Sequence, residues 1–369
     1  MSQNLITVTK LLSVGNVVSA SIRIYRDNFK SYCGVAIRAT LWFLLPFLAI
    51  IPIPLILVDD RANNSSFLLL IPVWLLLFAF CTTKSIVNRA IIGKLVFGVL
   101  ANKLETIRET RRTLAPKLWI FLWAFLGLFL IGILIGIGVA FVVFVFIAFV
   151  FAIISIFTNF PVDNDLTYLA VGITFWAIYL ILFMTLLNRF IFFEMPLVVE
   201  ENMTATRSLG RSWALTKGYI RRIFVILLVA TLVALPVGVI LYIYSEIFYD
   251  IFKILYEIFR LKPPIFSRSE INFSLEIVFD ILITATILIL PFGMTLGLIL
   301  VPVGVMLYIE LNNPTSLLLY LLFFYIIFSV SNVLILPFWQ AIKAVVYYDI
   351  LTRREGIDLQ LRKQNIQSS

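Results

Sequence analysis

The sequence predicts an all-α fold, a polytopic membrane helical bundle built from repeated units. Each unit is an interfacial amphipathic helix followed by a transmembrane hairpin. Of the 369 residues, 62% are hydrophobic and only 13% are charged, whereas about a quarter of a soluble domain is charged. Apolar runs of 20 residues or more recur along the chain, and about 20 residues are needed to span a bilayer. These long runs exclude an outer-membrane barrel, whose strands are short and alternating.

Seven apolar runs are the candidates for crossing helices. The third run is forty residues long and contains no charge. As one straight helix it would reach about 60 Å, twice the hydrocarbon thickness of a bilayer. The seven runs are Tyr32–Val58, Ser66–Ile92, Leu118–Phe157, Leu166–Asn188, Ile223–Tyr244, Ile277–Ile309 and Leu317–Ala341.

The distribution of charge predicts how the chain is oriented. Four segments, 1–38, 84–117, 189–222 and 339–369, together hold 24 of the 29 Lys and Arg but only 9 of the 20 Asp and Glu. Segments next to crossings that are rich in Lys and Arg face the cytoplasm. We therefore expect both termini to be cytoplasmic, in a bacterial cytoplasmic (inner) membrane.

An even number of crossings is needed to bring both termini to one side, and seven single crossings do not meet this condition. Prolines and glycines inside Ile277–Ile309 can break it into two shorter helices, notably Pro291 and Pro302. We therefore expect this run to turn back within or across the membrane, while Leu118–Phe157 contributes one long crossing with an interfacial or projecting part.

Two stretches of the chain align without gaps and indicate an internal repeat. Ser19–Leu41 aligns with Gly210–Leu232, with identities that include Ser21 and Ser212. We expect one integral membrane domain over 1–369, divided into a first half at 1–202 and a second half at 203–369, with an outer amphipathic insertion at 245–276. The duplication is typical of transporters with a site between their halves, but it can also simply build a bundle.

Two basic amphipathic stretches, Val14–Tyr32 and Thr204–Arg222, are predicted to lie at the membrane surface. In the second, the apolar stripe is Leu209, Trp213, Thr216 and Ile220. In the first, one face carries Val14, Val18, Ser21, Tyr25, Phe29 and Tyr32. Such helices turn their basic side toward anionic lipid, or merely orient the crossings. The candidate lipid contacts are Arg23, Arg26, Lys30, Arg207, Arg211, Trp213, Lys217, Arg221 and Arg222.

A further helix is predicted on the opposite side of the membrane, over Ser245–Leu261. Its charged residues of both signs form a narrow stripe, and the rest of its surface is apolar. The apolar part can lie in lipid headgroups or against another protein. The candidate partner contacts are Ile247, Ile251, Phe252 and Leu255.

No constellation for catalysis, cofactor binding or metal binding is visible. The chain has no histidine, and its two cysteines, Cys33 and Cys81, have no metal-ligand or redox spacing. No acidic residue falls clearly in the middle of a run, which argues against an ion-coupled carrier. Glu194 is expected to lie at the membrane interface and to be paired, and Asn332 to join helices through a hydrogen bond. The chain is therefore not expected to be an enzyme, to need a cofactor or to bind nucleic acid.

One segment carries a resemblance to a known family. Met195–Arg222 contains Pro196 and Glu200, followed by an Arg-Ser-Trp-x-Leu-Thr-Lys-Gly core at Arg211–Gly218. It resembles the membrane domain fused to some bacterial glycerophosphodiester phosphodiesterases, and related free-standing bacterial membrane proteins. The stretch Tyr347–Leu359 is also typical of that group, and the opening Ser13–Val18 resembles cyanobacterial members, for which a thylakoid location is an alternative.

The resemblance implies an architecture of amphipathic helices and hairpins, without phosphodiesterase activity, because a separate domain carries that chemistry in the fused enzymes. Our leading hypothesis is a non-enzymatic integral membrane protein that acts as a scaffold, accessory subunit or membrane-organising element. Its expected partners are anionic lipid headgroups on the cytoplasmic side, and another membrane protein complex or further copies of itself. The alternative is a channel or carrier for a small solute or lipid, with a site between the repeated halves.

Overall fold

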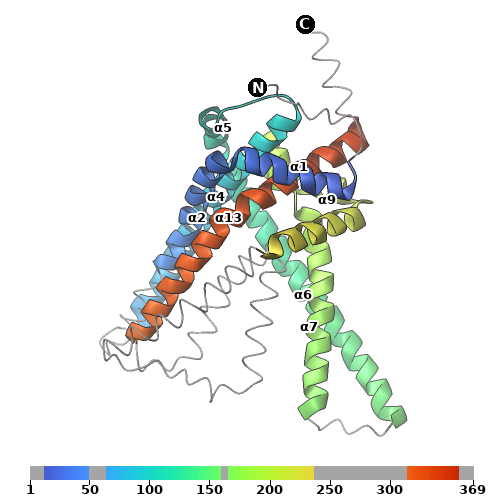
Figure 1. Cartoon of the computed structure of the whole chain (residues 1–369). Coiled ribbons are helices and arrows are strands. Elements are labelled where there is room, and N and C mark those ends of the chain that lie inside the picture. Colours follow the sequence, from blue (N-terminus) through green and yellow to red (C-terminus); the bar gives the residue numbers. More distant parts are fainter. Residues whose placement is uncertain (1–11, 50–63, 159–164, 237–313, 357–369) are drawn as a thin grey trace.

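The computed structural model of the chain describes residues 12–49, 64–158, 165–236 and 314–356 (Figure 1). These residues form helices and their connections, with no strand among them. The elements are α1 (Val14–Asp27), α2 (Phe29–Leu48), α4 (Asn64–Leu100), α5 (Ile107–Leu114), η1 (Ala115–Lys117), α6 (Leu118–Thr158), α7 (Asp165–Leu187), η2 (Asn188–Phe190), α8 (Glu194–Val199), α9 (Ala205–Thr216), a helix over Ile220–Pro236, and α13 (Pro314–Glu355).

Long apolar helices dominate the described residues, as the sequence predicts. Five of these helices are long and apolar enough to cross a membrane, and a sixth span results if α9 and the helix Ile220–Pro236, which meet at 91°, are counted together. The prediction of an all-α chain with several long apolar helices is confirmed. The predicted run Ile277–Ile309 and the predicted helix Ser245–Leu261, with Ile247, Ile251, Phe252 and Leu255, lie outside the described residues.

The helices form two arms that diverge from a common junction (Figure 1). One arm is the bundle of α2, α4 and α13, and the other is the hairpin of α6 and α7. At the junction lie α1, α5, α8 and α9, together with the last turns of α4 (84–100) and of α13 (339–355). We call this junction the cap.

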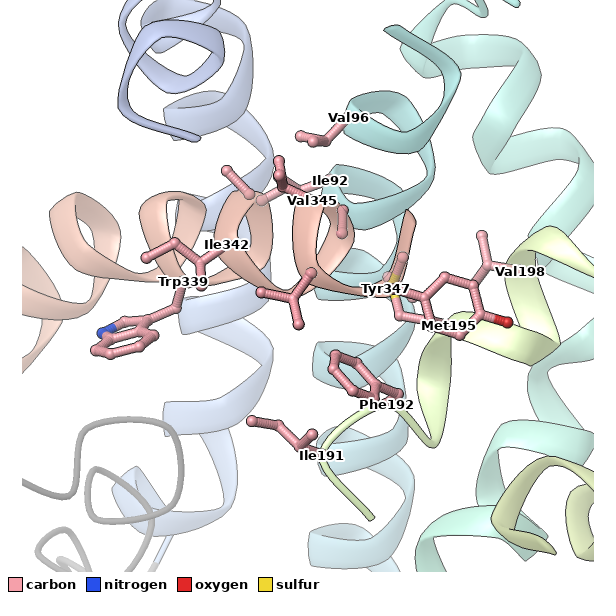
Figure 2. Packing of buried hydrophobic residues seen from close by; sticks show 14 of the residues in the cluster. Ile92, Val96, Ile191, Phe192, Met195, Val198, Trp339, Ile342, Val345 and Tyr347 are labelled. Carbon is pink, nitrogen blue, oxygen red and sulfur yellow. The ribbon is translucent and has the colours of Figure 1, made fainter. Parts of the chain in front are cut away.

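The cap holds most of the hydrophobic core. In the 18-residue apolar window within Ser329–Glu355 of α13, 67% is buried, against only 11% for the window within Ile107–Val150, a span that covers most of α6. In Figure 2, Ile191, Phe192 and Met195 of the segment that follows α7 lie against Tyr347 of α13 and residues of α4. Protein packing is therefore concentrated where the charged segments are, and the arms leave much apolar surface open.

Helix α6 is a single unbroken helix of 41 residues. Its glycines do not interrupt it, and they allow close packing instead: Gly127 meets Leu209, and Gly136 meets Tyr179 and Phe183 of α7. The prediction of one long helix in this run is confirmed, and its first turns, with Phe121 fully buried, belong to the cap.

The two ends of the described chain meet in the cap. The amide of Leu12 donates to Oδ1 of Asp349 at 3.2 Å. The start of the described chain is therefore held against the last turns of α13.

Candidate functional site

The cap is organised around the segment that follows α7, residues 188–199, which runs through its centre. Hydroxyl groups on the buried face of α9 bind the backbone of this segment. The Ser212 hydroxyl donates to the Arg189 carbonyl at 2.9 Å and accepts from the Phe192 amide at 3.2 Å. The Ser208 hydroxyl donates to the Phe193 carbonyl. Small hydroxyl side chains fit here because they satisfy backbone groups that would otherwise be buried unpaired.

This arrangement corrects the predicted apolar stripe of α9. Leu209 and Thr216 are buried as expected, but Trp213 is 39% exposed, while Ser208 and Ser212 are fully buried. The helix is rotated relative to the prediction because its buried face packs against the backbone of residues 188–199. The exposed Trp213 ring covers the guanidinium of Arg189, whose central carbon lies 4.5 Å from the ring centre.

One ion-pair network joins α8, α9 and α13. Nε of Arg211 lies 3.0 Å from Oε1 of Glu200, and Nη2 lies 2.5 Å from Oε1 of Glu355. The Tyr347 hydroxyl donates to the same oxygen of Glu200 at 2.7 Å. A guanidinium shared by two carboxylates from different elements fixes their relative position.

A second network holds the start of the described chain. The Asp349 carboxylate, only 2% exposed, lies 2.9 Å from Nη2 of Arg222 and 3.0 Å from Nε of Arg353. Both arginines also donate to the carbonyl of Leu12. The chain entering α1 is therefore fastened to α13 and to the helix that follows α9.

The structure divides the nine predicted lipid contacts into two groups. Arg211 and Arg222 are engaged inside the cap, and Trp213 covers Arg189. The other six are exposed, and their role as lipid contacts stays a prediction: Arg23, Arg26, Lys30, Arg207, Lys217 and Arg221.

Helix α1 has a protein partner for its apolar side. Val17, Val18, Ser21 and Ile24 are buried, and α1 packs against α13. The Tyr25 hydroxyl donates to the Leu334 carbonyl at 2.8 Å, and burial raises the pKa of this phenol above its ordinary value. The predicted face is buried at Val18, Ser21 and Tyr32, but it is wrong at Phe29, which is 46% exposed because it lies where α1 ends and α2 begins.

Two polar residues form the kind of contact that the sequence predicts. Glu194 is 2% exposed and paired with Lys343 at 2.6 Å. Asn332, also buried, donates to the Thr40 hydroxyl at 2.8 Å and so joins α13 to α2.

Several cationic contacts in the cap were missed, because they join residues far apart in sequence to backbone oxygens. Lys117 donates to the Leu197 carbonyl at 2.9 Å, and Arg354 donates to the carbonyls of Ala214 and Lys217. No sequence motif marks such contacts, since any carbonyl can accept them. Within the described ranges, no group of three or more His, Cys, Asp or Glu could hold a metal ion.

Comparisons with family models, curated proteins and solved structures found no match. The resemblance of Met195–Arg222 to the membrane domain of the phosphodiesterases therefore stays a prediction.

Proposed function

We propose that the chain is a non-enzymatic integral membrane protein that acts as a scaffold, accessory subunit or membrane-organising element. One observation carries the proposal: the arm formed by α6 and α7 presents an apolar surface that the rest of the described chain leaves uncovered (Figure 1). The bilayer covers part of such a surface, and a second membrane-spanning protein or another copy of the chain can cover the remainder.

The length of this arm supports a protein partner. Gly132 of α6 lies against Leu187, the last residue of α7, so the arm begins there and continues to Thr158. Its 27 residues reach about 40 Å, more than the roughly 30 Å of a hydrocarbon core. Phe141, Phe144 and other large side chains along it are more than half exposed.

The cap supplies the other half of the proposal, a rigid attachment on the cytoplasmic side of an inner membrane. Its exposed cations include Arg26, which is 76% exposed, and Arg207. Such cations next to crossing helices favour the cytoplasmic side of the membrane. Contacts with anionic headgroups there contribute about 1 kcal/mol for each basic residue near the surface. A thylakoid membrane is the alternative location if the source is cyanobacterial.

Photocrosslinking in native membranes tests the scaffold role. p-Benzoylphenylalanine is placed at Phe141 or Phe144, which are 67% and 65% exposed, and at Val143, which is 1% exposed and serves as the matched control. We expect a discrete protein adduct from the exposed positions that is absent from the buried one. Adducts with lipid alone at both exposed positions would reject the proposal.

The alternative role, a channel or carrier between repeated halves, is supported by the burial pattern. The alignment of Ser19–Leu41 with Gly210–Leu232 has an offset of 191 positions. At this offset, which we also apply to positions just outside the aligned stretches, a set of paired positions is buried in both copies. The buried pairs are Val17 and Ser208, Val18 and Leu209, Ser21 and Ser212, Ile24 and Leu215, Tyr32 and Ile223, Val35 and Ile226, Ala39 and Ala230, Thr40 and Thr231, and Phe43 and Ala234.

This pattern supports a duplication, and duplicated membrane folds are common among transporters. Purified protein in sealed proteoliposomes separates the two roles, with solute leakage and movement of labelled lipid between leaflets as the readouts. Flux above that of protein-free vesicles would favour the channel or carrier, and its absence together with a crosslinked partner would favour the scaffold.

A further inference from the structure

We propose that Arg89, Lys343 and Gln340 form a binding site for a phosphate-type oxyanion between α4, α8 and α13, with Glu194 as the single carboxylate of the site. The ligand is either the phosphate of a lipid headgroup or a free phosphate ion. The inference depends on this cluster alone and goes beyond the scaffold role.

The four residues come from three elements that meet in the cap. Glu194, in the first turn of α8, pairs with Lys343 of α13 at 2.6 Å, and the two side chains are 2% and 14% exposed. Gln340 lies one turn before Lys343 and is 4% exposed. Its Oε1 lies 3.8 Å from where a Cβ at Gly93 would stand, one turn beyond Arg89 on α4. The Glu194 carboxylate is close enough to Arg89 to act on its charge.

The cluster contains more positive than negative charge. Arg89 and Lys343 are cations, and within the described residues the Glu194 carboxylate interacts with both of them. An uncompensated charge in a protein interior is strongly destabilising unless a counterion or hydrogen bonds offset it. A bound monoanion would neutralise the cluster.

The cluster also contains polar atoms that lack partners. In the described part of the chain, Nε of Arg89 and Oε1 of Gln340 are buried without a hydrogen bond. An amide can offer either its oxygen or its NH2 to a ligand. Buried polar groups are normally paired, so two orphaned atoms beside an excess positive charge point to a missing ligand. A guanidinium offers paired N–H groups in one plane, which suits phosphate oxygens.

The direction of Arg89 explains how a headgroup would reach the site. Side chains of a helix tilt toward its N-terminus, and α4 runs toward the cap, so Arg89 points back toward the membrane-spanning part. Its guanidinium carbon lies 5.3 Å from the centre of the Phe43 ring of α2. The group is thus held at the boundary between the cap and the bundle, where the proposed orientation places the headgroups.

Thermal unfolding of the full chain in neutral detergent tests the site. The protein is titrated with phosphatidylglycerol, phosphatidylcholine or inorganic phosphate. If the ligand is a lipid headgroup, only phosphatidylglycerol should raise the Tm. If the ligand is the free ion, inorganic phosphate should raise the Tm as well. Arg89→Gln should abolish the rise. Arg26→Gln, the same change at a 76% exposed side chain, should keep it. An equal rise in Arg89→Gln and wild type would overturn the proposal, as would no rise in wild type.

Two further variants keep the test decisive if Arg89→Gln does not fold. Lys343→Gln leaves Arg89 and Glu194 to neutralise each other, so its Tm rise should be lost. Glu194→Gln raises the excess positive charge, so its half-saturating phosphate concentration should fall, on the order of tenfold. A weaker response in Glu194→Gln would contradict the proposal, because it would show that the carboxylate contributes to binding.

Discussion

Arg222 and Asp349 stand 127 positions apart in the chain, yet Nη2 of the arginine lies 2.9 Å from Oδ2 of the aspartate. The carboxylate is 2% exposed and the guanidinium 23%. Between them they fasten the helix after α9 to the last turns of α13, and both also bind the backbone of Leu12. The contacts that close the cap are therefore long-range and ionic.

Loss of the Asp349 charge should destabilise the cap. Asp349→Asn leaves Arg222 and Arg353 without their shared carboxylate, and breaking a buried ion pair costs about 3 kcal/mol. Unfolding in a denaturing detergent, followed by tryptophan fluorescence, measures the loss. The control is Asp27→Asn, which makes the same change in a carboxylate that is 51% exposed and pairs loosely with Arg23 and Arg26, so its effect should stay below about 1 kcal/mol. Equal effects would show that the Asp349 pairs contribute little.

The hydrogen bond between Asn332 and Thr40 should be measurable as a coupling energy. In a double-mutant cycle with Asn332→Leu and Thr40→Val, we expect a coupling of about 1 kcal/mol, typical of a side-chain hydrogen bond between membrane helices. Thr185→Val is the control, since that hydroxyl bonds to Ile181 within its own helix and should not couple to Asn332. A coupling near zero for Thr40 would mean that packing, and not this bond, joins α2 and α13.

Ser212 should stabilise the central segment of the cap locally. Ser212→Ala removes the acceptor of the Phe192 amide and the donor to the Arg189 carbonyl, and leaving such groups unpaired costs about 2 kcal/mol. Hydrogen exchange should become faster at Phe192 and its neighbours, while the ends of the arms keep their protection. Thr206→Ala, at an exposed position of the same helix, should leave the exchange unchanged. Unaltered exchange at Phe192 in Ser212→Ala would contradict this role.

Gly98 should be intolerant of a side chain, whereas Gly138 should accept one. A Cβ at Gly98 would lie 2.5 Å from the backbone oxygen of Lys103, which cannot move without disrupting the turn after α4, whereas nothing lies within 4 Å of a Cβ at Gly138. Overpacking of this kind costs about 1–3 kcal/mol. We therefore expect Gly98→Ala to lower the Tm and Gly138→Ala to leave it unchanged or raise it slightly. The same Tm in both variants would contradict the geometry at Gly98.

Exposed and paired cations should differ in their effect on lipid selection. Spin-labelled phosphatidylglycerol and phosphatidylcholine, reconstituted with the protein, report which lipid is immobilised at its surface. Neutralising the exposed cations should reduce the preference for phosphatidylglycerol without lowering the Tm. Arg211→Gln, in a partly buried pair, should lower the Tm and leave the preference intact. Unchanged lipid preference in the first variant would reject the lipid contacts. The exposed set is Arg23, Arg26, Lys30, Arg207, Lys217 and Arg221.

The long helices could be predicted because membrane insertion selects for a signal that lies in consecutive residues. The run Leu118–Phe157 differs by one residue from α6 (Leu118–Thr158). The run Ser66–Ile92 is less accurate, since α4 continues to Leu100. Beyond Ile92 the helix leaves the apolar region and packs into the cap. Charged residues such as Lys94 therefore end the apolar run but do not end the helix.

The cap could not be predicted in the same way, because its contacts depend on partners distant in sequence. Arg211 and Arg222 fit the pattern of a basic lipid-facing surface, and nothing local indicates that Glu200, Glu355 and Asp349 would meet them. The face of α9 was misjudged for a related reason. Hydropathy treats serine as a surface residue, but a serine hydroxyl is suited to a buried interface when its partner is a bare peptide backbone.

The position of α13 near the end of the chain affects when the cap can form during synthesis. This helix is the last described element to leave the ribosome, yet it supplies Tyr347, Asp349 and Glu355 to groups made more than a hundred residues earlier. Until then Glu200, Arg211 and Arg222 have no partners from this helix, so the cap cannot close. Quality control that recognises exposed polar groups would therefore have a long interval in which to act, and a chain that stops short of Asp349 would remain in that unfinished state.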